Sequence, residues 1–175
     1  LGPLIFSFCS WIKDVYHEEQ ADKIAFVARE GYLIKLAYDV IYAIEEANTE
    51  YVRLNKNVIR WPSLCKNPTV EQFEESIPYR KMYSGEELAR LLSISPQFVG
   101  QLLQEHGFCT KNIQKSDFKT VEFKAAFDKI LEHEKVEMHE QYVLLIRYLK
   151  QIGAIDKRTL LVNNSVNGSA QRSIR

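Results

Sequence analysis

The sequence has little of what marks several specialised classes of protein. Seven glycines and five prolines in 175 residues exclude collagen-like chains and Pro/Gly-rich disordered chains. Three cysteines, an odd number at wide spacing, exclude a disulfide framework and a zinc ribbon and are typical of a reducing compartment. Basic and acidic side chains number 23 each, so no net charge draws the chain to nucleic acid or to a membrane. We therefore expect a cytoplasmic protein with no nucleic-acid partner.

The sequence also lacks a hydrophobic run long enough to cross a membrane. The first twelve residues are largely apolar, but Lys13 and Asp14 follow, and a bilayer span needs about 20 apolar residues. A basic segment and a small-residue cleavage site, which mark a signal peptide, are missing as well. This pattern predicts a buried helix over about 3–19. The missing initiator Met, and a C-terminal end that resembles the start of a helix, predict that the chain is a piece of a longer protein.

What the sequence does contain begins with a β-α-β unit. The short apolar run over 23–28 is typical of a parallel strand that is covered on both faces. A turn at 29–31 leads into a helix over 32–47. Apolar residues mark one face of this helix at helical spacing, namely Leu33, Leu36, Ala37, Val40, Ile41 and Ile44. A second strand is expected over 51–55, parallel to the first.

Helices are expected in the middle of the chain. Between residues 70 and 153 the pattern predicts only helices, before a third strand over 159–163. These helices are expected over about 70–76, 84–93, 95–106 and 115–131, followed by a long one that ends near residue 152. The prediction is an α/β fold with a Rossmann-like parallel sheet core and a mostly helical insertion. The predicted boundaries are 1–62 for the first part of the core, 63–130 for the insertion, and 131–175 for the last helix, strand and loop.

Positive charge follows the predicted strands. The stretches 51–70 and 157–175 carry lysines and arginines but no acidic residue, and Arg29 leaves the first strand in the same way. Ligands of open α/β sheets bind at the carboxyl ends of the strands, and a helix that begins near Ser169 would offer free N–H groups to an anion. The pattern favours a site for phosphate or a nucleotide sugar. The alternative is that these side chains are solvated or pair with acids of the insertion.

Three other motifs are weaker. Residues 84–107 read as a helix-turn-helix, but the second helix has no Lys or Arg for DNA phosphates, so we expect a structural hairpin. His133 and Glu137 could share a helix face, but the spacing is not that of a zinc protease, and a solvated charged helix is expected. No Gly-x-Ser-x-Gly elbow occurs, and no motif places a histidine beside a cysteine.

Carboxylates are scarce where a metal-dependent enzyme would need them. Among the residues that follow the three predicted strands, only Glu30 is acidic, and the third strand ends in Asn163. An amide cannot balance the charge of a magnesium ion or act as a base. No metal ligand and no cofactor is predicted, and Mg²⁺ would be needed only if the protein is an enzyme.

Three segments resemble a known family. Phe26–Tyr32, Tyr51–Pro62 and Leu161–Gln171, together with Leu1-Gly2-Pro3, resemble the region after the catalytic domain in predicted hydrolases of the haloacid dehalogenase-like superfamily. These bacterial proteins are associated with surface-polysaccharide biosynthesis and are often fused to glycosyltransferases. The resemblance implies a haloacid dehalogenase-like fold. The chain also resembles type I phosphoribosyltransferases, but more weakly, because it lacks the paired acids of their pyrophosphate loop.

The chain departs from the family pattern at polar positions. Glu30 stands where the family has Asp, Asn55-Lys56-Asn57 replaces Ser-Arg-Arg, and Asn163 replaces the Asp of the third motif. The Asp-x-Asp nucleophile motif of the superfamily is absent from the 175 residues. These departures imply a retained fold with weakened or altered chemistry.

We therefore expect a ligand-binding module, weakly active or inactive, of a polysaccharide-assembly protein that binds a phosphorylated or nucleotide-linked sugar. The alternatives are a phosphatase-type hydrolase or a glycosyl or phosphoryl transferase, and a helical module that docks a glycosyltransferase. Glu30 is the one candidate catalytic residue. The candidate ligand-binding residues are Arg29, Gly31, Asn55, Lys56, Arg60, Asn163, Gly168 and Ser169.

Overall fold

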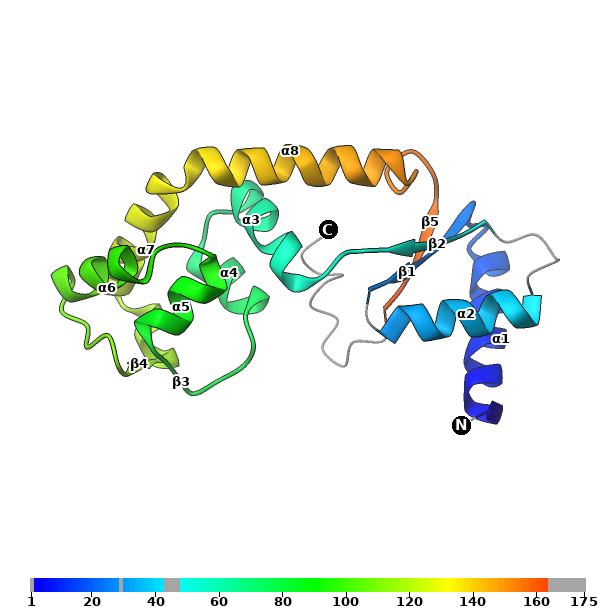
Figure 1. Cartoon of the computed structure of the whole chain (residues 1–175), viewed down its shortest axis with the longest axis horizontal. Helices are drawn as coiled ribbons and strands as arrows, with labels where there is room; N and C mark the ends of the chain where they lie inside the picture. The colour runs from blue at the N-terminus through cyan, green and yellow to red at the C-terminus, as the bar shows by residue number, and fades with distance from the viewer. Residues whose placement is uncertain (1, 29, 43–47, 164–175) are drawn as a thin grey trace. The chain divides into compact units, whose positions relative to one another are not determined.

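The computed structural model of the chain describes residues 2–28, 30–42 and 48–163, and of Glu30 and Lys56 it describes the backbone alone. The chain divides into two compact units (Figure 1). Unit 1 consists of Leu1–Asn55 and Leu144–Arg175, and unit 2 of the continuous segment Lys56–Val143.

A three-stranded parallel sheet forms the centre of unit 1. Its strands are β1 (Lys23–Val27), β2 (Thr49–Val52) and β5 (Thr159–Val162), in the order β2-β1-β5. The register places Phe26 between Tyr51 and Val162. The predicted α/β class and the parallel pairing are confirmed, although β2 begins two residues before the predicted strand and ends at Val52.

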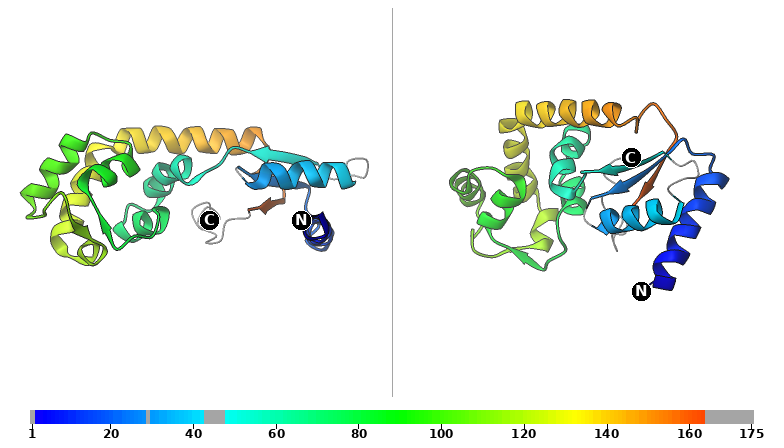
Figure 2. Two further views of the ribbon diagram at one scale, coloured as in Figure 1. Left: turned by 60° about the horizontal axis from the view of Figure 1, so that its bottom comes forward. Right: turned by 45° about the vertical axis from the view of Figure 1, so that its right-hand side comes forward.

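Both faces of β1 are covered, as its continuous apolar run predicted. Every residue of the strand is buried. Ile24 and Phe26 pack with Cys9 and Ile12 of α1 (Gly2–Glu18) and with Tyr38 of α2 (Glu30–Tyr42). The last turns of α8 (Lys135–Gln151) lie on the opposite side of the sheet (Figures 1 and 2).

The buried Lys23 ties the sheet to the end of α8. Its Nζ donates hydrogen bonds to the Ile152 carbonyl at 2.6 Å and to Glu50 Oε2 at 3.2 Å. An ammonium beside the last carbonyls of a helix is favourable, because those carbonyls lack intrahelical partners. This contact explains why a lysine is tolerated with only 7% of its surface exposed.

The buried face of α2 matches the predicted one only in part. Leu33, Leu36 and Val40, which we call the α2 stripe, are 68%, 44% and 86% exposed. Ala37 and Ile41 of the predicted face do pack on the unit 1 core, together with Ile34, Tyr38 and Tyr42, and Ile44 lies outside the described residues. Apolar residues occupy more than one side of this helix, so periodicity alone could not identify the side that faces the sheet.

Unit 2 is a helical unit with its own apolar core. The expected helices are present, except that a 3-10 helix over 115–119 and an α-helix over 121–133 replace the single helix predicted over 115–131. Helix α3 was not predicted, and neither was the two-stranded antiparallel pair of β3 and β4. The elements of the unit are α3 (Lys56–Lys66), α4 (Val70–Ser76), β3 (Met82–Tyr83), α5 (Gly85–Leu92), α6 (Pro96–Glu105), β4 (Ile113–Gln114), the 3-10 helix η1 (Lys115–Lys119), α7 (Val121–His133) and the first half of α8.

Local sequence signals fix the ends of these helices. Ser84 and Glu87 form a capping box at the start of α5, and Ser95 precedes Pro96 at the start of α6. A row of aromatic rings, which meet in stacked, tilted or edge-to-face pairs, packs behind them. Its members are Phe73, Tyr83, Phe108, Phe118, Phe123 and Phe127.

Among the described residues, no helix combines the length and the apolar character needed to cross a membrane.

Candidate ligand-binding site

The carboxyl ends of the three strands meet at one edge of the sheet, because β1, β2 and β5 are parallel. The backbone pairing continues one residue beyond β1, where the Ala28 N–H donates to the Val52 carbonyl at 2.9 Å. Gly31, Asn55 and Asn163 all follow strand ends at this edge. The topology therefore places three of the predicted ligand-binding residues after strand ends at one edge of the sheet, with Gly31 following the central strand β1.

Gly31 allows α2 to begin very close to β1. It lies in the first turn of the helix and is buried. A Cβ atom at this position would lie 3.1 Å from the carbonyl carbon of Phe26, closer than nearly all real contacts of this kind. The first N–H groups of an α-helix have no intrahelical acceptor and favour an anion. Glycine thus places these donors at the carboxyl edge of the sheet.

A tyrosine from α8 holds the segment that follows β2. The Arg53 N–H donates to the Tyr148 hydroxyl oxygen at 3.0 Å. Asn55, two residues further on, is half-buried, and so is Asn163 after β5. Both asparagines have interaction partners.

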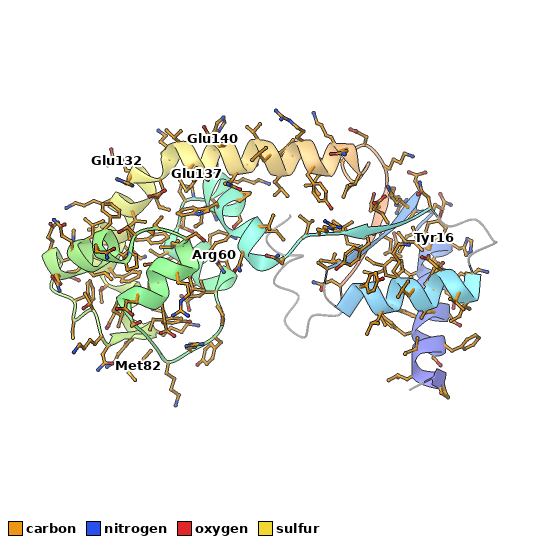
Figure 3. All side chains as sticks on the ribbon, in the orientation of Figure 1. Tyr16, Arg60, Met82, Glu132, Glu137 and Glu140 are labelled. Carbon is orange, nitrogen blue, oxygen red and sulfur yellow. The ribbon has the colours of Figure 1, made fainter. Side chains whose placement is uncertain are left out.

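Arg60 lies in unit 2, on helix α3 (Figure 3). The residue is 3% exposed on α3. Its Nε and Nη2 donate to Ser76 Oγ at 3.2 Å and to the Ser76 carbonyl at 3.4 Å. Further hydrogen bonds reach the Leu91 carbonyl and Asn57 Oδ1. Burial lowers the pKa of Arg60, and these protein acceptors engage every nitrogen of the group.

Arg53 is the cation at the sheet edge that our candidate set did not include. It directly follows β2 and is exposed. Within the described residues, the Arg53 side chain takes part in no hydrogen bond or ion pair. The hydrogen bond to Tyr148 is made by the Arg53 backbone N–H. No signal in the sequence could have distinguished Arg53 from Arg60, because Arg53 lay inside the strand predicted over 51–55, whereas β2 ends at Val52.

The other predicted site residues lie outside what the structure describes. Arg29, Gly168 and Ser169 are not among the described residues, and the side chains of Glu30 and Lys56 are not described. Glu30 is the first residue of α2, so its backbone lies at the helix N-terminus beside Gly31. Lys56 is the first residue of α3 and belongs to unit 2.

The helix-turn-helix segment has the expected form. Helices α5 and α6 are joined by three residues, with Ser93 in the left-handed conformation (φ 57°), and Leu88, Val99 and Leu103 are buried in the core of the unit. Helix α6 carries no lysine or arginine. The segment is thus a helical hairpin of the unit 2 core.

The acidic segment near His133 contains a break between two helices. Helix α7 ends at His133 and α8 begins at Lys135, so His133 and Glu137 do not share one helix. Glu132, Glu137 and Glu140 are exposed on the two helices (Figure 3). Across residues 2–28, 30–42 and 48–163, no three His, Cys, Asp or Glu side chains are grouped so that they could hold a metal ion.

No protein-family model matches the chain, and no curated protein matches it.

Proposed function

We propose that the protein is a ligand-binding module, weakly active or inactive as an enzyme, that binds a phosphorylated or nucleotide-linked sugar. The ligand site is the carboxyl edge of the β2-β1-β5 sheet. In this proposal the sheet is haloacid dehalogenase-like, and the module serves a bacterial polysaccharide-assembly protein, as the sequence resemblance implies.

The close approach of α2 to β1 at Gly31 is the observation that carries this proposal. It places a helix N-terminus at the edge where all three parallel strands end. Arg53 adds a positive charge at the same edge. A dianionic phosphate needs donors and charge of this kind, and the Tyr148 hydrogen bond supports the segment that carries Arg53.

An anion screen tests the proposal. The chain is mixed with millimolar inorganic phosphate, inorganic pyrophosphate or uridine diphosphate glucose, and thermal unfolding is measured. A ligand at 100 times its dissociation constant stabilises the folded state by about 2.7 kcal/mol, so a clear rise in Tm is expected with at least one of the three. No rise with any of them would count against the site.

Weak or absent catalysis is tested with an aryl phosphate in the presence of Mg²⁺. We expect no turnover by the parent chain, because Asn163 cannot supply a carboxylate at the end of β5. A gain of turnover in Asn163→Asp would support an altered active site. Turnover by the parent that disappears in Glu30→Gln would establish the alternative, a hydrolase or transferase that uses Glu30.

A protein-docking function is the second candidate, and the α2 stripe favours it. Leu33, Leu36 and Val40 form an exposed apolar row at helical spacing, which is unusual for a monomer surface. In the segment 70–130, the exposed large apolar residues are Tyr79, Met82 and Val121. The test is direct titration with an isolated glycosyltransferase domain, in which Val40→Gln should weaken binding if the stripe is the contact.

A further inference from the structure

We draw no further inference here: the strongest candidate, the exposed apolar side chains Leu4, Phe6 and Trp11 on α1, carries none, because nothing in the structure shows what covers them.

Discussion

The cores of units 1 and 2 differ in how far apart along the chain their segments lie. The core of unit 2 lies within one continuous segment, between Trp61 and Met138. The core of unit 1 joins α1, β1 and α2 to Val162, which arrives only after all of unit 2. Unit 1 also keeps the α2 stripe, Tyr32 and Arg53 accessible. The core of the helical unit is local in the sequence, whereas the core of the sheet unit depends on residues from both ends of the chain.

The largest effect is expected in the core of unit 2. Phe73 is fully buried and lies 5.1 Å from Phe127 and 6.3 Å from Phe118, centroid to centroid. Phe73→Ala should lower the free energy of unfolding by about 3–5 kcal/mol, because it leaves a cavity. Hydrogen exchange followed by mass spectrometry should show lost protection in peptides from 56–143. Val121→Ala, at a position that is 78% exposed, should show almost no change. Equal loss of protection in β1 would contradict two separate cores.

The two arginines that follow β2 separate stability from binding. Arg60→Ala should destabilise unit 2 by about 2–4 kcal/mol in urea denaturation, because the Leu91 carbonyl and the buried Ser76 lose their donor. Phosphate affinity should stay at the parent value wherever the variant is folded. Arg53→Ala should instead weaken phosphate binding and change the free energy of unfolding by less than about 0.5 kcal/mol. Loss of phosphate binding in folded Arg60→Ala would restore Arg60 to the site.

The contrast between these arginines also shows how far the sequence could be interpreted. Apolar runs predicted β1 and β5 closely, and the helix over 70–76 matches α4, because local periodicity and the Thr69 cap determine them. Helix α3 was missed because Trp61-Pro62 reads as the end of a strand, although Pro62 lies inside the helix. The role of Arg60 depends on Ser76 and Leu91, which are distant in sequence. Charge patterns alone cannot reveal such partners.

A smaller effect is expected from the glycine at the sheet edge. Gly31→Ala should destabilise unit 1 by about 1–3 kcal/mol, since the new methyl group meets the Phe26 backbone at 3.1 Å. Gly100→Ala, in the interior of α6, is the matched control. Its Cβ would only touch Thr110 at 3.9 Å, so a gain of about 0.5–1 kcal/mol is expected. If denaturation showed that both alanines stabilise the protein, α2 would not approach β1 as closely at Gly31 as described.

The smallest effect at neutral pH concerns Tyr38. Burial, then the neighbouring Tyr42, raises the pKa of Tyr38 to about 12 from an ordinary value of 10. A raised pKa means that this contribution to stability is complete below pH 10 and is lost as the pH rises toward 12. Tyr38→Phe should therefore flatten the fall in stability over that range. Circular dichroism at a series of pH values measures it, with the exposed Tyr79→Phe as a control. The same alkaline curve for Tyr38→Phe and the parent would contradict this assignment.

The position of β5 in the chain has a consequence for synthesis on the ribosome. β5 pairs with β1, yet about 100 residues separate it from β2, and a ribosome takes roughly 5–20 s to add that many. All of unit 2 leaves the ribosome during this interval, while the side of β1 that pairs with β5 is still unpaired. Lys23 opens β1 at that side, and a charged residue on an unpaired strand discourages pairing with other chains. The lysine that later holds the end of α8 would first protect the nascent sheet from aggregation.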